Sequence, residues 1–495
     1  MKKISYWGVV GLPLLSISPV WSAPIAPPTA KTVAKPIVKP ATKPIIKPAT
    51  KPTAKSPVKP VANVAAKPVA TKSSSLERLP NGITFIARPD KIAPRAAISL
   101  VLRVGAADET PQTAGWRRLL VNAMLRGVPK GYESSATGLE ATEALSRAAE
   151  KVSGTLGATV GDDFVEIFVV GDAEKAPELL DFALAFWKNP RLSDADIDAA
   201  RERTQNQIEA DDLDTAGKTQ AALRSQLFRD ARGELSAYGL SDFGTTASLA
   251  SLSNEKIRAF HAQKLVSARL TAAATGNFDA AALREKLKNQ PALLPRDAAP
   301  PSFARPKAGS PALVVRELPV PSAWVFVSYP LAGNTQNDAA TLRVLAAALG
   351  DAKDARLPAR LLKSRPLGSA PSAISVAAQF IPRRYGGELV LYSQTGPQNV
   401  ERVKNALLDE IRRLRDAPLS NSELQSAKTY ARGTWSIERL GLRERAFQTA
   451  LAPALGGPLD TTFPTRLQSV TSAQIQAAAK KYLQAYAVAL VMPGE

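Results

Sequence analysis

Histidine and cysteine, the residues that most often bind metals or attack substrates, are almost absent from this chain. Its 495 residues include no cysteine and one histidine, His261. No disulfide, iron–sulfur cluster, thiolate zinc site or cysteine nucleophile can form, and with one histidine this chain cannot supply two histidine ligands to a zinc ion. A Ser–His–Asp arrangement could use only His261, which lies beside Ile257 and Phe260 in an amphipathic stretch. We expect His261 to be a partly exposed structural side chain.

Adjacent carboxylates are the other candidates for chemistry. Asp162 and Asp163 are neighbours, as are Asp211 and Asp212. General acid–base catalysis can use such a pair, but we interpret these four as solvated charges in loops or at helix ends. No glycine-rich phosphate loop, nucleophile elbow or dinucleotide-binding fingerprint stands out.

The formal charge of +20 is distributed unevenly. Residues 1–75 contain twelve lysines and no acidic residue, whereas residues 76–495 contain 52 basic and 44 acidic residues, a net charge of only +8. A nucleic-acid-binding protein needs a concentrated basic face, and residues 76–495 show none. We therefore expect no nucleic-acid partner.

The N-terminal residues predict export from the cytoplasm. Lys2 and Lys3 precede an apolar run from Ile4 to Val20, and a cleavage site is expected near Val20 to Ala23. This order is typical of a secretory signal peptide over residues 1–23, with an uncleaved membrane anchor as the alternative. The expected location is the periplasm or cell envelope of a Gram-negative bacterium.

Residues 24–75 form a low-complexity segment, called the tether below. Lysine recurs every four residues over much of it and is usually followed by proline. Proline at this density prevents helix and sheet, and the like charges repel one another, which predicts a disordered, extended chain. The tether could be a plain spacer, or it could contact an anionic surface of the cell envelope.

Elements able to position functional residues begin after residue 76. Apolar residues alternate from Ile98 to Val104, as in a strand, and follow a helical period from Trp116 to Met124. Gly127 is expected to end that helix as a C′ glycine. Strands and amphipathic helices continue to mix as far as the C-terminus, which predicts an α/β or α+β fold rather than an all-helical one.

An internal repeat divides this folded region. Residues 192–201 match 419–428, and residues 251–257 match 469–475 in the same order, at offsets of 227 and 218 residues. The first pair predicts matching helix starts with a serine cap and acidic residues in the first turn. Two such matches indicate two homologous halves.

The boundaries of these halves follow from composition. Residues 291–311 are rich in proline and alanine, as expected of a linker. The predicted organisation is therefore an N-terminal domain over 76–290 and a C-terminal domain over 312–495.

The residues at the start of the first domain resemble those of the pitrilysin/insulinase metallopeptidase family. The resemblance rests on Arg103 to Pro111, Gly115, and Ala123 to Gly127, and it covers essentially all of residues 76–495. It implies two α/β-sandwich domains of the mitochondrial-processing-peptidase type. Enzymes of this family carry H-x-x-E-H on the helix, where two histidines bind zinc and the glutamate activates the zinc-bound water; a glutamate about eighty residues later completes the ligand set.

The resemblance also implies that this catalytic set is missing. Aligned on the flanking residues, H-x-x-E-H falls on Arg118, Val121 and Asn122, and the later glutamate falls near Ala199 or Ala200. Arg118 is a permanent cation that would repel zinc, and Val121 cannot polarise water. Asn122 is a poor zinc ligand and Ala200 has no ligating atom. We expect no metal or other cofactor.

In the family's short two-domain members, an arginine and a tyrosine of the second domain help to bind the peptide. The alignment places Leu362 and Ser369 at these positions, and Arg360, Lys363 or Arg365 could substitute with a shifted register. The sequence leaves the substrate-binding residues open.

Three functions are consistent with these observations. The first is an exported, catalytically inactive subunit that encloses a peptide-binding chamber together with a zinc-bearing homologue, as a heterodimer. The second is an envelope-associated scaffold that binds a peptide or protein without proteolysis, with its basic tether on an anionic surface. The third is an active hydrolase with another mechanism.

Overall fold

The computed structural model describes residues 19–20, 76–133, 140–213, 215–230, 232–294, 312–333, 335–363, 371–459 and 461–494. The rest of the predicted signal peptide, the tether, and linker residues 295–311 lie outside the described residues. The predicted boundaries of these segments therefore stay predictions. Below, the first half means residues 76–294 and the second half means residues 312–494.

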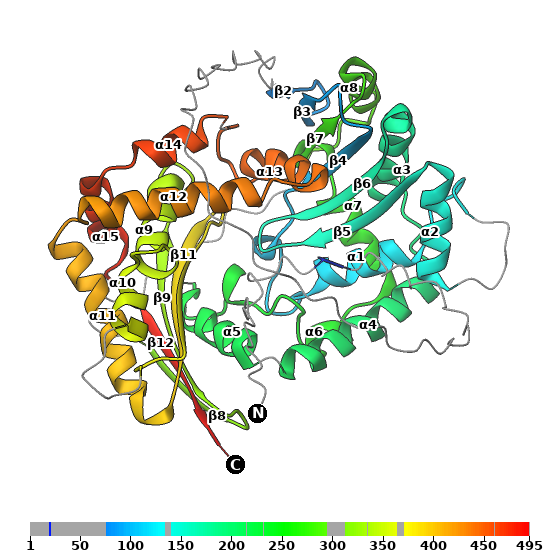
Figure 1. Cartoon of the computed structure of the whole chain (residues 1–495). Helices are drawn as coiled ribbons and strands as arrows, with labels where there is room; N and C mark the ends of the chain where they lie inside the picture. Colours follow the sequence, from blue (N-terminus) through cyan, green and yellow to red (C-terminus); the bar gives the residue numbers. More distant parts are fainter. Residues whose placement is uncertain are drawn as a thin grey trace, which may run out of the picture. The chain divides into compact units, whose positions relative to one another are not determined.

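The first half contributes all but one strand of a seven-stranded mixed sheet (Figure 1). Its order across the sheet is β1 (Pro19–Val20), β5 (Gly154–Val160), β6 (Val165–Asp172), β4 (Arg95–Leu102), β7 (Leu270–Gly276), β3 (Thr84–Pro89) and β2 (Leu76–Arg78). Only β3 and β7 are parallel neighbours. The predicted strand around Ile98 to Val104 is confirmed as β4, shifted a few residues towards the N-terminus.

The second half forms a five-stranded mixed sheet. Its order is β10 (Ser375–Ile381), β11 (Gly386–Thr395), β9 (Ala323–Ala332), β12 (Ala487–Pro493) and β8 (Ala312–Leu318). Here too one neighbouring pair is parallel, β8 with β12. If β2 is left out, β3 to β7 of the first half and β8 to β12 of the second follow the same spatial order: third, fourth, second, fifth, first along the chain.

Helices pack around both sheets. In the first half they are α1 (Trp116–Arg126), α2 (Ala141–Lys151), α3 (Ala176–Lys188), α4 (Asp194–Leu213), α5 (Thr215–Leu227), α6 (Thr246–Ala250), α7 (Asn254–Lys264) and α8 (Ala280–Lys288). In the second half they are α9 (Ala339–Gly350), α10 (Arg356–Pro358), α11 (Val400–Asp416), α12 (Asn421–Ile437), α13 (Leu442–Ala454), α14 (Phe463–Ser469) and α15 (Ser472–Tyr482). Among the described helices, none combines the length and apolar character needed to cross a bilayer. The expected mixture of helices and strands is confirmed, and it forms two α/β domains, each built on a mixed sheet.

Local capping explains the sequence repeat. Ser253 accepts a hydrogen bond from Lys256 N at the start of α7, and Thr471 accepts one from Gln474 N at the start of α15. Ser420 likewise caps α12, which corresponds to α4 in the first half. Serine and threonine satisfy the free N–H groups at helix starts, so the repeated sequence produces equivalent helices in the two halves.

Each sheet is partly covered by a helix from the other half. On α13, Phe447 and Ala450 pack against Val101 and Ala273 of the first sheet. The equivalent helix of the first half, α5, packs against the second sheet, where Leu223, Leu227, Phe326 and Ala487 share one apolar cluster. Figure 1 shows α13, drawn in orange, beside the strands of the first sheet. The two halves therefore exchange helices and bury apolar surface together.

Close backbone approaches fix both ends of α1. Gly115 precedes the helix with φ of +85°, and a Cβ there would lie 2.3 Å from Phe243 O. The helix ends at Arg126, so the prediction that Gly127 ends it is confirmed, but Gly127 has φ of −99° and ψ of 110°, an extended conformation rather than the left-handed one typical of a C′ glycine. Glycine is required at position 127 because a Cβ would lie 2.2 Å from Arg191 O and 2.9 Å from Asp196 Oδ2.

A buried ion pair joins α13 to the first sheet. The side chain of Glu166 on β6 is fully buried, accepts a hydrogen bond from Ser99 Oγ at 2.8 Å, and contacts the Arg443 guanidinium of α13. Arg443 Nη2 also donates to Thr159 Oγ1 at 2.9 Å. Burial raises the pKa of Glu166, and the positive charge of Arg443 opposes that shift. A carboxylate buried in this way stays charged at an acceptable free-energy cost only while its cation is present.

Asp162 and Asp163 lie at a second polar contact between the halves, so the expectation of solvated charges is wrong for this pair. Arg383 is fully buried and bridges Asp162 in the first half and Glu388 Oε2, at 2.8 Å, in the second. Burial would raise the pKa of Asp162, but Arg383 and then Arg224 lower it well below its ordinary value. The side chains of Asp211 and Asp212 lie outside the described residues.

Asp163 is held by hydrogen bonds rather than by a cation. Tyr238 Oη donates to Asp163 Oδ1 at 2.6 Å, and the backbone N–H of Arg384 donates to Oδ2 at 2.9 Å. Burial raises the pKa of Asp163 to about 6, against the effect of these two donors. The surroundings of these two neighbouring aspartates therefore shift their pKa values in opposite directions: the pKa of Asp162 is lowered and that of Asp163 is raised.

Removing the cation from the buried pair should destabilise the protein strongly. We expect Arg443→Met to lower the free energy of unfolding by about 3–5 kcal/mol, because Glu166 is left buried without its partner. Arg443→Met combined with Glu166→Gln should recover most of that loss. The matched control, Arg147→Met in a half-exposed pair with Glu143, should change the free energy by less than about 1 kcal/mol. Urea titrations of all four proteins measure these values, and equal losses in the single and double variants would contradict this prediction.

The pH dependence of stability should reveal Asp163. Its folded-state pKa of about 6 exceeds the ordinary 3.8, so the stability it contributes is full below 3.8 and is lost as the pH rises through 6. An asparagine at this position cannot titrate. We therefore expect the unfolding free energy of Asp163→Asn, relative to the wild type, to rise by about 2 kcal/mol between pH 4 and pH 7.5. Urea titrations across this range measure the difference, with the exposed Asp172→Asn as control. A difference that stays flat would rule out a buried, titrating Asp163.

Candidate functional site

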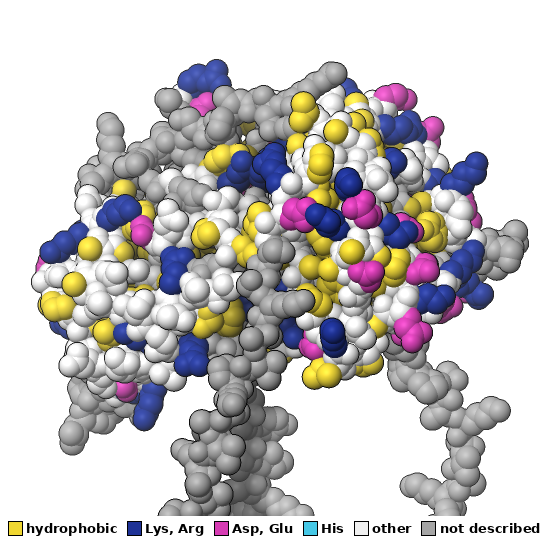
Figure 2. Space-filling view, turned by 90° about the horizontal axis from the view of Figure 1, so that it is seen from above, with side chains coloured by type: hydrophobic (Ala, Val, Ile, Leu, Met, Phe, Trp, Pro, Cys, Tyr) yellow, Lys and Arg dark blue, Asp and Glu magenta, His cyan; other side chains and the backbone are white. Residues whose placement is uncertain are grey.

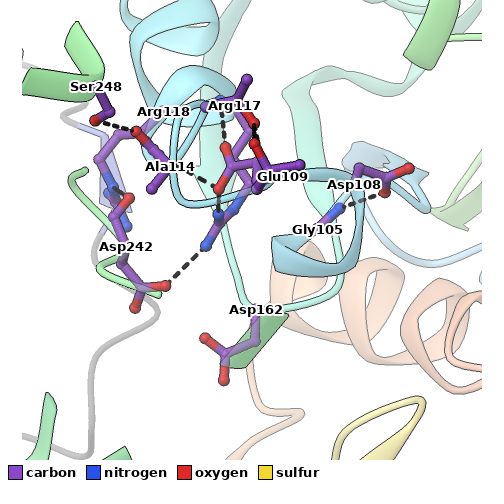
Figure 3. Close-up of polar contacts among 12 residues, drawn as sticks. Gly105, Asp108, Glu109, Ala114, Arg117, Arg118, Asp162, Asp242 and Ser248 are labelled. Atoms are coloured by element: carbon purple, nitrogen blue, oxygen red, sulfur yellow. Dashed lines mark hydrogen bonds and ion pairs between the residues drawn. The ribbon is translucent and has the colours of Figure 1, made fainter. Parts of the chain in front are cut away.

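The predicted motif positions lie on α1, which packs against α4 in the first half. Arg118 is buried: its guanidinium lies over the ring of Phe243, 4.3 Å from the centroid, and its Nε is 3.4 Å from Asp242 O. Val121 is buried in the apolar core of the first half. The Arg118 cation is thus held by an aromatic face and a carbonyl, as Figure 3 shows in part.

Asn122 faces α4. Its Nδ2 donates to Thr204 Oγ1 at 2.9 Å and to Gln207 Oε1 at 3.1 Å. Thr204 Oγ1 in turn donates to Ala200 O at 2.8 Å. The structure thus brings Asn122 close to the turn of α4 that contains Ala200, but the side chains that meet Asn122 are those of Thr204 and Gln207.

Sequence reasoning did not single out Thr204 and Gln207. The helical period offered a signal, because residues four and seven positions after Ala200 lie on the same face of α4. An alignment that places one glutamate near Ala199 or Ala200 does not show the other residues that the same helix face presents to its neighbour.

The first turn of α1 is anchored by buried ions. Glu109 accepts hydrogen bonds from Arg117 N at 2.8 Å and Gly115 N at 3.3 Å, and its carboxylate pairs with the Arg117 guanidinium. Arg117 Nη2 pairs with Asp242 Oδ1 at 2.7 Å (Figure 3). Burial acts to lower the pKa of Arg117, but the negative charges of Glu109 and Asp242 outweigh it and raise the pKa above its ordinary value. The guanidinium therefore stays charged. This group is structural: it fixes the turn between Gly115 and α1.

The same ions connect to the contact between the halves. Arg224 on α5 lies 3.6 Å from Asp242 and 3.7 Å from Asp162, and Asp162 pairs with Arg383. A continuous series of alternating charges therefore runs from the start of α1 to the second sheet. These groups neutralise one another, which favours a structural role over acid–base chemistry.

His261, the sole histidine, is partly buried on α7. Its Nε2 lies 2.8 Å from Trp187 O. Burial lowers the pKa of His261, and the hydrogen bond to Trp187 acts in the opposite direction. Ile257 and Phe260 beside it are buried in the core. His261 is therefore partly exposed, as expected.

Positions suggested in the second half are occupied by internal contacts. Leu362 packs against the core, and Lys363 Nζ contacts Lys353 O at 3.2 Å. Arg360 pairs with Asp409 and Glu410, each at 3.0 Å. Arg365 and Ser369 lie outside the described residues.

A cavity of about 630 Å³ adjoins Arg360. Its lining comprises Asp354, Arg356, Ala359, Arg360, Glu410, Arg413, Ala417 and Glu423. Its three acidic and three basic side chains, apart from Asp354, form ion pairs with one another, for example Arg356 with Glu423 at 2.7 Å. This arrangement leaves no net charge with which to select a substrate.

Comparisons with solved structures identify this architecture. A protease from Helicobacter pylori has a TM-score of 0.72 at 15% identity, over 85% of this chain and 99% of that chain. A peptidase M16 inactive domain from Pseudomonas fluorescens gives 0.72 at 16%, over 85% and 98%. A chain of Complex III2 from Candida albicans gives 0.66 at 18%, over 84% and 95%. Identities this low show a shared fold. Among curated proteins, none matches the sequence.

Sequence comparison with protein families goes further. The family model described as insulinase (peptidase family M16) matches residues 84–239, and the one described as peptidase M16 inactive domain matches residues 251–430. Both models describe parts of one family, and together they span well over half of the chain. The first match contains α1, and the second runs from the end of the first half into α12. The chain therefore belongs to the insulinase (M16) peptidase family.

Proposed function

We propose that this protein is an exported, non-catalytic member of the M16 family that builds a peptide-binding chamber with a zinc-bearing homologue. The observation that carries the proposal is the combination of packing and residue types in α1. The helix keeps its flanking glycines, its packing on α4 and its anchoring ions, while the positions aligned with H-x-x-E-H are Arg118, Val121 and Asn122.

The residues at these positions do not fit zinc. A zinc site needs three protein ligands, usually His, Cys, Asp or Glu. Arg118 brings a cation, Val121 an apolar side chain, and the aligned Ala200 only a methyl group. Asn122 Oδ1 is buried without a hydrogen-bond partner, but it is one neutral oxygen. Within the described ranges, no group of three or more His, Cys, Asp and Glu residues could hold a metal ion.

The edge of the first sheet supports a role in holding a peptide. β5 lies beside α1 and α2. On its outer side, β5 pairs antiparallel with β1 through only two β5 residues, Ala158 and Thr159. Among the described residues, Gly154 to Gly157 have no strand partner on that side. Free N–H and C=O groups at a sheet edge can pair with an extended peptide. A peptide at this edge would lie next to the face of α1.

Activity measurements with and without a partner test this proposal. The purified chain alone should not hydrolyse unstructured peptides, with or without added zinc. Mixed with an exported M16 homologue that has an intact H-x-x-E-H, it should form a stable complex and change the hydrolysis rate of that homologue. Chelator should abolish the activity of the mixture, and the homologue alone provides the control.

Two results would contradict the proposal. One is the lack of any complex together with unchanged activity of the zinc-bearing homologue. The other is chelator-sensitive proteolysis by this chain alone, which would favour an active hydrolase.

A scaffold of the cell envelope is the second candidate, favoured by the lysines of residues 24–75. In this case the tether contacts an anionic surface and the folded region binds a peptide or protein without cleaving it. Deleting residues 24–75 should release the protein from the envelope fraction and leave its partner binding intact. A tether of the same length with every lysine replaced by glutamine separates charge from reach. Unchanged retention in both variants would identify a plain spacer.

A further inference from the structure

Two apolar side chains lie exposed next to each other on β8, an edge strand of the second sheet. Leu313 is 60% exposed and Val315 is 55% exposed. Side chains two residues apart on a strand share a face, and the exposed Glu317 continues the same row. We call these three residues the β8 face. Single apolar residues among charges of both signs, as in Figure 2, are ordinary on a protein surface, whereas an adjacent pair on an edge strand indicates a contact surface.

The β8 face lies on the side of the second sheet that the helices of the second half cover. On the neighbouring strand β12, Val488 pairs with Leu313 and Leu490 pairs with Val315. Val488 and Leu490 are buried in the apolar core of the second half. Because paired residues of neighbouring strands point to the same side of a sheet, the apolar layer continues onto β8 and becomes exposed there. The helix that packs on β8, α5, lies against the opposite side.

The first half shows what covers the equivalent strand. β3 has the same position in the first sheet as β8 has in the second, and α8 packs against it. Phe85 of β3 is 5% exposed and shares one apolar core with Leu283 and Leu287 of α8. These two leucines are four residues apart and therefore lie on one face of the helix. Figure 1 shows α8 beside β3 and β7.

Polar contacts accompany this apolar packing. Arg284 of α8 pairs at 2.9 Å with Glu77, which lies on the strand next to β3. The C-terminal end of α8 is fixed by Asn81, whose Nδ2 donates to Leu287 O at 2.7 Å. A short amphipathic helix with two leucines and a neighbouring cation thus matches a sheet edge that carries apolar side chains and an acid.

The second half has the same kind of sheet edge without the helix. In the first half, α8 follows β7; among the described elements, no helix follows β12, which corresponds to β7. Glu317 has no ion-pair partner within the described ranges. The β8 face therefore combines an exposed apolar pair with a negative charge, and a helix that resembles α8 would complement both.

We propose that the β8 face docks an amphipathic helix of a partner protein, with leucine-type side chains four residues apart and a basic residue beside them. The helix would lie on the second sheet as α8 lies on β3, cover Leu313 and Val315, and bring its cation to Glu317. Recognition of this kind depends on apolar side chains that repeat along one helix face. The β8 face is separate from the β5 edge, and the proposal does not depend on the proposed function.

A synthetic peptide with the sequence of residues 278–290, which contain α8, is the probe. Labelled with fluorescein and titrated with the full chain, it should show saturable binding by fluorescence anisotropy. Leu313→Ser should weaken binding at least about fivefold, because apolar area that the peptide would cover is removed. Val315→Thr keeps the side-chain shape and the strand propensity and should weaken binding less. The control Ile92→Ser, at a residue that is 92% exposed in the first half, should bind as the wild type does.

The charge and the helix face are tested separately. Glu317→Gln should weaken binding about two- to fivefold at low salt and less at high salt, because an exposed ion pair is screened. A probe peptide that carries Leu283→Gln and Leu287→Gln together should lose the saturable binding.

Binding that both Leu313→Ser and Val315→Thr leave unchanged would overturn the proposal, as would equal binding of the two probe peptides. Sedimentation velocity of the chain alone gives a further test. A concentration-dependent dimer of the wild type that Leu313→Ser abolishes would assign the β8 face to a second copy of this chain and contradict the docking of a partner helix.

Discussion

The exchange of one helix between the halves is the constraint on which the rest of the structure depends. α13 packs on the first sheet and α5 on the second, so neither sheet completes its apolar packing without the other half. Both contacts also contain buried ions, Glu166 with Arg443 and Asp162 with Arg383. Apolar burial supplies most of the stabilisation, and the ions select one arrangement because a mispaired buried charge is costly.

This constraint explains how α1 is held in place whichever residues occupy the positions aligned with H-x-x-E-H. Its first turn is bound by Glu109 and Asp242 through Arg117, and Asp242 connects through Arg224 to the contact between the halves. Its other faces are buried in the core of the first half. The helix is therefore required for folding whether or not it binds zinc.

Much of this fold could be predicted from the sequence. The repeat at helix starts such as Ser253 and Thr471 anticipated two similar halves, because capping is a local property. The environment of Asp163 could not be predicted, since its partner Tyr238 is 75 residues away and its contact with Arg384 crosses between the halves. The extended conformation of Gly127 could not be predicted for the same reason, because the backbone that approaches it closely, at Arg191, is distant in the sequence.

Zinc binding by the purified full chain tests the central claim most directly, namely that α1 keeps its structural role without its metal site. After incubation with excess zinc and gel filtration, elemental analysis should find far less than one zinc per chain, while a homologue with intact H-x-x-E-H retains one. One zinc per chain, lost on Asn122→Ala, would contradict the account.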